Sequence, residues 1–266
     1  MRVLVTGAGS GIGRATVEVL SDRGNEVVAT ARRVEAVADL AERPGVVALP
    51  LDVTNDASVD TCVAAAGRID ALVNNAGITE TGPMETYPHD VLVKMFETNT
   101  FGPMRMIRAL APAMRERGEG VIVNVTSVEG KVAGPLAGAY SATKHALEAL
   151  SESLALEIGH FGVRVVIVEP GYIAPGMRNA VRHGEDGTVY EELRRQWSGA
   201  DETLVGPGGR PGPELVGEAI ADALADPATP LRVPVGADAE MVLGARKQLS
   251  DEDFLTTMRG VLGLDW

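Results

Sequence analysis

The sequence has one cysteine, a deficit of basic residues and no apolar run long enough to cross a membrane. Cys62 has no second cysteine with which to form an intramolecular disulfide, and its neighbours in 59–64 favour a packed side chain on a helix over a nucleophile. The chain carries 24 Lys and Arg against 37 Asp and Glu, a formal net charge of −13. Nucleic acid and anionic membrane surfaces are therefore excluded as expected partners. Residues 1–7 lack the apolar region of a signal peptide, so the cytoplasm is the expected location.

Short apolar runs alternate with segments of helical spacing along the 266 residues. The runs lie at 3–5, 26–29, 46–49, 71–73, 121–125, 163–168 and 231–235, and helical spacing occurs at 13–23, 34–42, 90–116, 140–160 and 213–225. Strands that are apolar on both faces and separated by helices are typical of a parallel sheet covered on both sides. We therefore predict an α/β, doubly wound Rossmann fold with a seven-stranded parallel sheet flanked by helices on both faces.

One segment, 172–212, interrupts this alternation after the sixth strand and is rich in Gly and Pro. A connection of this length at the end of a strand is typical of a substrate lid, and a surface helical insertion is the alternative. No internal repeat, low-complexity tract or interdomain linker divides the chain, so residues 1–266 are predicted to form one domain. Residues 236–266 are predicted to be a C-terminal helical extension.

A glycine-rich turn, with Gly7, Ser10, Gly11, Ile12 and Gly13, joins the first strand to the first helix. Glycine lets the backbone approach a pyrophosphate and adopt a positive φ, and a helix N-terminus offers free N–H groups and a favourable dipole. The spacing is T-G-x-x-x-G-x-G, because Ile12 stands where the G-x-G-x-x-G fingerprint needs glycine. The order of strand, turn and helix predicts a dinucleotide-binding site.

The end of the second strand distinguishes between the two nicotinamide dinucleotides. An acidic residue there would bind the ribose 2′-hydroxyl of NAD, but this position holds Ala31 and is followed by Arg32 and Arg33. Guanidinium groups suit a 2′-phosphate. NADP(H) is therefore the expected cofactor, and NAD(H) is the less favoured alternative.

Tyr140 and Lys144 lie four residues apart in a helical segment, so their side chains share one helix face. An ammonium beside a phenol favours the phenolate and lowers the pKa of the tyrosine. Ser127 follows the fifth apolar run, where it can hydrogen-bond the oxygen that the tyrosine protonates. The three residues predict a proton-transfer site for a carbonyl or an alcohol.

Taken in order, these motifs resemble those of the short-chain dehydrogenase/reductase family in its single-domain (classical) branch. The resemblance covers nearly the whole chain and extends to Asp52 with Val53, the N-N-A-G sequence with Asn75, Ala76 and Gly77, Asn99, and Pro170 with Gly171. It implies that Asp52 and Val53 lie on the adenine side of the cofactor and that Pro170 and Gly171 open its nicotinamide side.

One position departs from the family pattern. Pro175 stands where family members usually carry a threonine that holds the nicotinamide carboxamide. A backbone group of Ile173 is expected to take over that contact.

The resemblance also implies a mechanism, in which hydride transfer is coupled to proton transfer by Tyr140. Lys144 is expected to lower the pKa of Tyr140 and to bind the nicotinamide ribose, and Ser127 to hydrogen-bond the substrate oxygen. Asn99 is expected to hold a water that connects Lys144 to solvent. No metal ion is expected.

The substrate is expected to be a mainly apolar small molecule with a ketone, an aldehyde or a secondary alcohol. The residues expected to line its pocket are Val128, Leu136, Tyr172, Met177 and Trp197. The function predicted from the sequence is thus an NADP(H)-dependent oxidoreductase that interconverts carbonyl and alcohol. A catalytically silent NADP(H)-binding sensor and an NAD-dependent alcohol or hydroxysteroid dehydrogenase remain the alternatives. By resemblance we also expect a homo-oligomer, a dimer or a tetramer, formed through the helices of 90–116 and 140–160.

Overall fold

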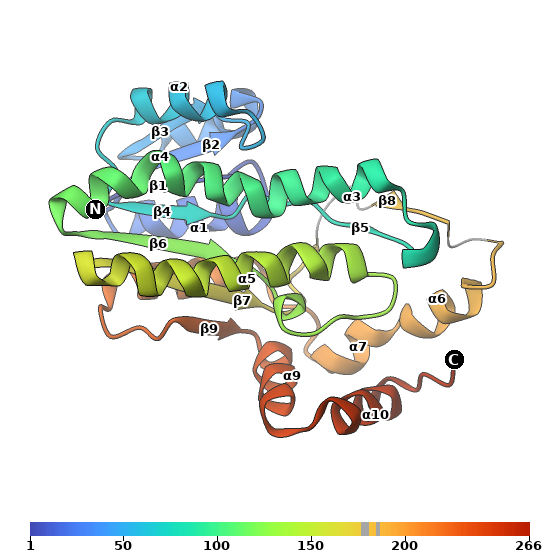
Figure 1. Ribbon diagram of the computed structural model, residues 1–266. Coiled ribbons are helices and arrows are strands. Elements are labelled where there is room, and N and C mark those ends of the chain that lie inside the picture. Colours follow the sequence, from blue (N-terminus) through green and yellow to red (C-terminus); the bar gives the residue numbers. More distant parts are fainter. Residues whose placement is uncertain (177–180, 185–186) are drawn as a thin grey trace.

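A seven-stranded parallel sheet forms the centre of the protein (Figure 1). The computed structural model describes residues 1–176, 181–184 and 187–266. The strands of this sheet are β1 (Arg2–Val5), β2 (Glu26–Ala31), β3 (Val46–Pro50), β4 (Ala71–Asn74), β6 (Gly120–Val125), β7 (Val163–Pro170) and β9 (Arg232–Val235). Their order is β3-β2-β1-β4-β6-β7-β9, and every neighbouring pair is parallel. The order reverses between β1 and β4, where an open α/β sheet forms its ligand crevice.

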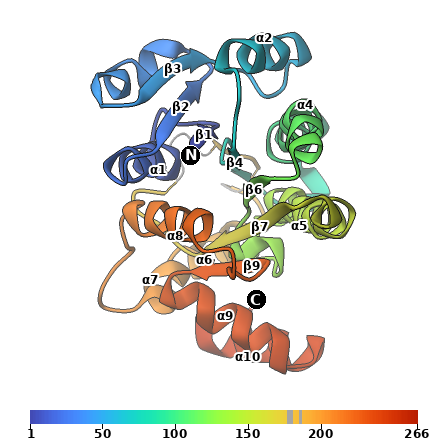
Figure 2. The ribbon, with the colours of Figure 1, turned by 90° about the vertical axis from the view of Figure 1, so that its left-hand side faces the viewer.

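Helices cover both faces of the sheet, as the end-on view in Figure 2 shows. The helices that flank the sheet are α1 (Gly11–Asp22), α2 (Asp56–Ala66), α3 (His89–Phe96), α4 (Gly102–Arg117), α5 (Gly138–Ile158) and α8 (Glu214–Ala225). Within β1, Val3 and Val5 belong to the core beneath α1 and α8, whereas Leu4 belongs to the core beneath α2 and α4. Both faces of the inner strands β1, β4 and β6 are therefore buried, as the continuous apolar runs predicted, whereas Val47 on the edge strand β3 is exposed.

The segment 34–42 is not the α-helix that its spacing predicted. It forms two 3₁₀ turns, η1 (Val34–Val37) and η2 (Asp39–Glu42). The two fully buried side chains, Val37 and Leu40, are three residues apart, which matches the three residues per turn of a 3₁₀ helix. The prediction of helical structure was therefore wrong in the type of helix.

The long helix predicted at 90–116 is interrupted. Helices α3 and α4 are joined by a π turn, η4 (Glu97–Phe101), which contains Asn99. Single π turns inside helices occur frequently at functional sites. The remaining 3₁₀ turns are η3 (Met84–Thr86), η5 (Val128–Gly130) and η6 (Gly159–Phe161).

The chain after β7 leaves the sheet and returns along one end of the molecule (Figure 1). Its described elements are α6 (Glu191–Trp197), α7 (Ala200–Val205) and β8 (Val181–Arg182), and β8 pairs in parallel with β5 (Glu80–Thr81). After β9 the chain ends in α9 (Ala237–Gln248) and α10 (Asp251–Leu262). Among the described residues, no helix has the length and apolar character that crossing a membrane requires.

Candidate active site

Tyr140, Lys144 and Ser127 are brought together at the carboxyl end of the sheet. Tyr140 and Lys144 lie one turn apart near the start of α5, and Ser127 follows β6 at the N-cap of η5. The Lys144 Nζ lies 5.7 Å from the centre of the Tyr140 ring and donates to the Val125 carbonyl at 2.9 Å. Ser127 hydrogen-bonds Tyr140, and its Oγ also accepts from the Glu129 N–H at 3.1 Å. The three side chains therefore face one volume, as the sequence predicted.

The electrostatics of the pair differ from the expectation. Burial raises the pKa of Tyr140, and the Glu129 carboxyl raises it further, whereas the hydrogen bond with Ser127 acts in the opposite direction. The expected lowering by Lys144 is not found in this structure. Burial lowers the pKa of Lys144 to about 8, although Glu148 opposes the change. Loss of water therefore disfavours the charged form of both groups, the phenolate and the ammonium.

The side chain of Asn99 is buried beside this group and forms three hydrogen bonds within the protein. Its Oδ1 accepts from the Ile78 N–H at 2.8 Å, and its Nδ2 donates to the Ile78 carbonyl at 2.8 Å and to the Thr143 Oγ1 at 3.0 Å. These bonds join the segment after β4 to α5. Both Nδ2 protons are thus used by the protein, whereas Oδ1 accepts one hydrogen bond, and the expected water between Lys144 and solvent stays a prediction.

The glycine turn is built for close backbone contact. Gly7 has a φ of +69°, and a Cβ at this position would lie 2.8 Å from the Ala76 Cα. A Cβ on Gly13 would lie 2.4 Å from the Gly7 carbonyl oxygen. Only glycine therefore fits at either position. Ser10 forms the N-cap of α1 without a side-chain cap, which leaves the first N–H groups of the helix facing the cleft that Gly9, Ser10 and Gly11 line.

Hydrogen bonds join the turn after β4 to the glycine turn. The Thr6 Oγ1 accepts from the N–H groups of Asn75 and Ala76, each at 3.0 Å. The Asn75 Nδ2 donates to the Thr6 carbonyl at 2.9 Å. Asn75, Ala76 and Gly77 consequently form one wall of the cleft, with the glycine turn beside them.

Acidic and basic groups lie at the far end of the cleft from Tyr140. Asp52 and Val53, after β3, line it together with Arg32 and Arg33, after β2. Burial alone would raise the pKa of Asp52, but hydrogen bonds from Thr54 and the charge of Arg32 hold it below its ordinary value. Both arginines are exposed, and neither forms a salt bridge within the described part of the chain.

The carboxyl end of β7 supplies Pro170 and Gly171 to the cleft, followed by Tyr172 and Ile173. A Cβ on Gly171 would lie 2.1 Å from an oxygen of Asp238, whose Oδ2 accepts from the Tyr172 N–H at 2.7 Å. Asp238 is 5% exposed and belongs to α9. The C-terminal extension therefore fixes this loop, a role that sequence reasoning missed.

The loop continues into the position that departs from the family pattern. The Ala174–Pro175 peptide is cis. Within the described part of the chain, the N–H of Ile173 has no hydrogen-bond partner, so it is available to a ligand in the cleft. That the backbone of Ile173 replaces the usual threonine stays a prediction.

The cleft has a volume of about 1520 Å³, above the range of about 300–1,000 Å³ typical of drug-sized ligands, so it is large enough for a dinucleotide with a substrate. Val128, Tyr172 and Trp197 line it as predicted, whereas Leu136 is not among the lining residues. Leu136 instead has a φ of +62°, and its carbonyl accepts from the Gly82 N–H. Met177 lies outside the described residues.

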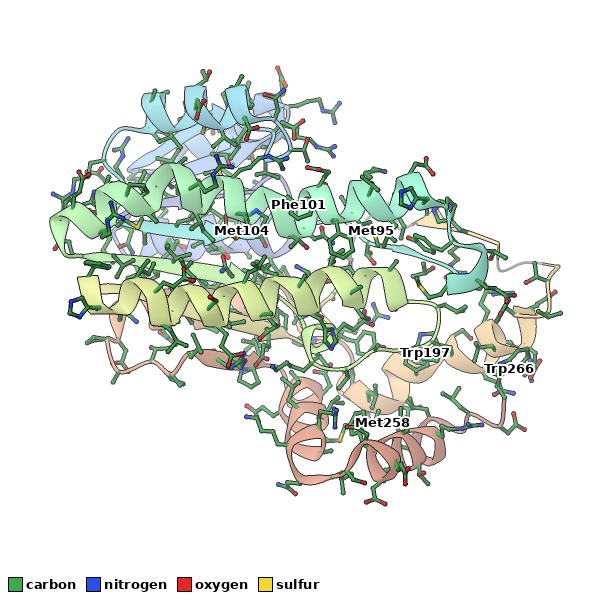
Figure 3. The ribbon with its side chains drawn as sticks, in the orientation of Figure 1. Met95, Phe101, Met104, Trp197, Met258 and Trp266 are labelled. Carbon is green, nitrogen blue, oxygen red and sulfur yellow. The ribbon has the colours of Figure 1, made fainter. Side chains whose placement is uncertain are left out.

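The two C-terminal helices supply an apolar wall that was not predicted. The apolar lining residues from this part of the chain are Val242, Phe254, Leu255, Met258, Leu262 and Leu264, and the charged ones are Asp238 and Arg259. Figure 3 shows Trp197, whose ring packs against Gly134, on the side of the cleft where Met258 projects from α10 toward α7. The substrate end of the cleft is therefore mainly apolar.

A family model described as short chain dehydrogenase matches residues 1–186. The chain belongs to the short-chain dehydrogenase family. An uncharacterized oxidoreductase of Schizosaccharomyces pombe is 34% identical over 229 residues, which cover 85% of this chain and 96% of that protein. As a member of this family, the protein is an oxidoreductase that acts on CH–OH donors.

Solved structures of family members share the whole fold. A short-chain dehydrogenase from Streptomyces avermitilis is 39% identical with a TM-score of 0.83, and the match covers 100% of this chain and 98% of that one. A short-chain dehydrogenase from Burkholderia cenocepacia, in complex with NADP, is 29% identical with a TM-score of 0.76, and the match covers 96% of this chain and 95% of that one. The parallel sheet and its two helical layers are therefore the family's Rossmann fold.

Proposed function

We propose that this protein is an NADP(H)-dependent oxidoreductase that interconverts a carbonyl and an alcohol on a mainly apolar small molecule. The observation that carries this proposal is that Ser127, Tyr140 and Lys144 line the same cleft as the glycine turn. A dinucleotide held by that turn and by the wall at Asn75 would reach from Arg32 toward Tyr140. The cleft then continues into the apolar wall of the C-terminal helices.

In this mechanism the bound cofactor supplies or accepts the hydride. Tyr140 donates its phenolic proton to the carbonyl oxygen during reduction. Ser127 hydrogen-bonds the same oxygen and stabilises its developing charge. Reduction is the proposed direction, because enzymes that use NADP(H) more often act as reductases.

Lys144 is assigned two tasks. Its ammonium donates to the Val125 carbonyl and lies over the Tyr140 ring, so it is held beside the reacting group. By family resemblance it also binds the nicotinamide ribose. Asn99 is assigned a positioning role, because its side chain joins Ile78 to Thr143 on α5.

The preference for NADP(H) rests on Arg32 and Arg33. Both line the adenine end of the cleft, and their guanidinium groups suit a 2′-phosphate. The family member from B. cenocepacia was solved with NADP. Asp52 and Val53 would contact the adenine, while Pro170, Gly171 and the backbone of Ile173 would hold the nicotinamide.

Residues 172–212 are proposed to close over the substrate. Tyr172 and Trp197 line the cleft, and the Arg210 guanidinium lies 5.2 Å from the centre of the Tyr172 ring. The segment is also held by a contact with Glu80, which lines the cleft. The Glu80 carboxylate accepts from the Lys94 Nζ at 2.8 Å and lies 2.7 Å from the His183 Nε2.

We further propose a homodimer or homotetramer formed through the faces of α4 and α5. Large apolar side chains are exposed on or beside these helices, at Phe101, Leu156 and Phe161, and Leu156 is 83% exposed. Apolar side chains exposed together mark interaction surfaces. Light scattering of the purified protein measures the mass directly.

A turnover assay separates this function from that of a silent sensor. Purified protein with NADPH is offered 2-octanone, octanal and an aromatic ketone, and the loss of NADPH absorbance is followed. We expect turnover of at least one carbonyl, with a lower KM for NADPH than for NADH. Tight NADPH binding without turnover of any of them would support the sensor instead.

A further inference from the structure

Glu129 lies beside the proposed proton donor and has no role in the mechanism above. It is the second residue of η5, two positions after Ser127, and its N–H donates to the Ser127 Oγ at 3.1 Å. It lines the cleft, and its charge acts on Tyr140. The carboxyl group is therefore held close to the atoms that would react.

This carboxyl group lacks a charged partner. In the part of the chain that the structure describes, no Lys, Arg or His forms a salt bridge with Glu129. Its one side-chain contact is the Ser141 hydroxyl, which lies 3.2 Å from the Glu129 Oε2 and 3.0 Å from the Ala137 carbonyl. One hydroxyl proton serves only one acceptor at a time, so the carboxylate is poorly satisfied by the protein.

An unpaired carboxylate in such a place is costly for folding. Burial raises the pKa of Glu129 to about 7, although the hydrogen bond from Ser141 opposes the change. The chain already carries a net charge of −13, so its solubility does not depend on the charge of Glu129. A perturbed carboxyl group in a cleft, beside the reacting residues, indicates a binding role.

The surroundings of Glu129 define what it would bind. The lining of the cleft includes the apolar side chains Val128, Val132, Ala133, Trp197 and Met258, together with the basic side chains Lys94, Arg210 and Arg259. A substrate that fits both parts is polar at the reacting end and apolar beyond it. An ammonium or a hydroxyl near the reacting carbon would supply the donor that the protein does not.

We propose that Glu129 is a specificity residue that binds an ammonium or hydroxyl group on the carbon next to the reacting carbon. The substrate class is thus a vicinal amino alcohol or diol with an apolar chain, or the corresponding ketone. This inference rests on the proposed function. The reaction itself is unchanged: the alcohol loses a hydride to NADP⁺ and a proton to the enzyme, and yields the ketone and NADPH.

Three alcohols that differ only at the neighbouring carbon test the inference. They are 2-octanol, 1,2-octanediol and 1-amino-2-octanol, oxidised with NADP⁺ at about pH 8, where the amine is protonated and Glu129 is ionised. We expect kcat/KM to rise in the order 2-octanol, diol, amino alcohol, with about tenfold or more between the first and the last. The preference for the amino alcohol should weaken as the pH falls through about 7, because Glu129 becomes protonated.

Variants assign the preference to Glu129. Glu129→Gln keeps an acceptor but no charge, so it should lose the preference for the amino alcohol and retain that for the diol. Glu129→Leu should lose both. Glu157→Gln, an exposed carboxylate at the other end of α5, is the matched control and should keep both. NADPH binding by fluorescence, together with the melting temperature, shows whether each variant is folded.

The possible results distinguish a failure of this inference from a failure of the proposed function. Unchanged selectivity ratios in folded Glu129→Leu overturn the inference alone, as does a wild type that oxidises 2-octanol as well as the other two. A wild type that oxidises none of the three and reduces no carbonyl overturns the proposed function, and the inference falls with it.

Discussion

At the scale of single residues, the chemistry of the cleft depends on how far each group is removed from water. Tyr140 is 8% exposed and Lys144 is 3% exposed, so burial works against the charged form of both. The pKa of the phenol rises and that of the ammonium falls to about 8. Tyr140 is thereby kept as a proton donor, and Lys144 is held in place by the Val125 carbonyl. Without cofactor, the effect of Lys144 on the pKa of Tyr140 is smaller than the spacing of the two residues on the helix predicted.

Arg32 tests the cofactor preference. Replacing Arg32 by Ala removes a guanidinium from the adenine end of the cleft, where it lines the wall with Arg33. We expect the KM for NADPH to rise by about tenfold or more while the KM for NADH changes little, because a charge-assisted hydrogen bond contributes about 1.5–3 kcal/mol. Initial-rate kinetics with both cofactors measure this.

A matched change elsewhere controls for the loss of charge. Arg108→Ala removes an exposed guanidinium on α4 that does not line the cleft, and it should leave both KM values as in the wild type. Equal losses for NADPH and NADH in Arg32→Ala would contradict the assignment of the 2′-phosphate to this residue.

At the scale of elements, the sequence predicted the sheet well because each central strand is a continuous apolar run. All seven runs are strands, and the glycine turn, N-N-A-G, Ser127 and Pro170-Gly171 each follow one of them. The carboxyl ends of parallel strands meet at one edge, so local motifs far apart in the sequence converge without knowledge of the packing. This explains why most of the predicted site residues line one cleft.

Elements whose form depends on packing were predicted less well. The π turn at Asn99 and the 3₁₀ turns at 34–42 follow from contacts with neighbouring elements, which periodicity does not report. Leu136 was expected in the pocket from its nearness to Ser127, but its backbone adopts a positive φ and it does not line the cleft. The apolar residues of α10 enter the cleft only because the helix docks there. In the sequence, nothing distinguishes Asp238 from any other acidic residue in the first turn of a helix.

Asp238 tests the link between the C-terminal helices and the cofactor site. In Asp238→Ala the Tyr172 N–H loses its acceptor, and the loop of Gly171 loses the side chain packed against it. We expect weaker NADPH binding by about tenfold, with a smaller effect in Asp238→Asn because the amide keeps an acceptor oxygen. Fluorescence titration of NADPH measures the Kd independently of turnover.

The control for this change is in the same helix. Glu240→Ala removes an exposed carboxylate from the first turn of α9 and should leave the Kd unchanged. If Asp238→Ala binds NADPH as tightly as the wild type, the C-terminal helices do not position the nicotinamide loop.

At the scale of the whole molecule, the buried carboxylate of Glu148 on α5 pairs with Arg232 on β9, at the edge of the sheet. The Glu148 carboxylate accepts from the Thr126 Oγ1 at 2.7 Å and from the Arg232 Nε at 3.0 Å. Glu169, on β7, lies 4.0 Å from the same guanidinium, and its Oε1 has no hydrogen-bond partner among the described residues. Burial and the charge of Glu148 raise the pKa of Glu169 to about 7, against the attraction of Arg232.

This raised pKa makes the stability of the protein depend on pH. The folded state binds a proton at Glu169 that the unfolded state, with a pKa of 4.5, has lost. The free energy of unfolding therefore falls between about pH 4.5 and 7, and the full penalty is present above pH 7. We expect Glu169→Gln to raise it by about 1–3 kcal/mol at pH 8 and by little near pH 5.

Urea denaturation at the two pH values measures this difference. Glu157→Gln, which removes an exposed carboxylate, should leave the stability nearly unchanged at both. A Glu169→Gln variant that is less stable than the wild type at pH 8 would show that the ionised carboxylate stabilises the fold.

The central claim is that Tyr140 transfers the proton, and Tyr140→Phe tests it most directly. We expect kcat for the best carbonyl substrate to fall by about 10²–10⁴-fold, because a positioned acid contributes that much, while the Kd for NADPH stays within about twofold. Tyr190→Phe removes a phenolic hydroxyl outside the cleft lining and should keep full activity. Retention of more than about a tenth of the wild-type activity in Tyr140→Phe would contradict the account.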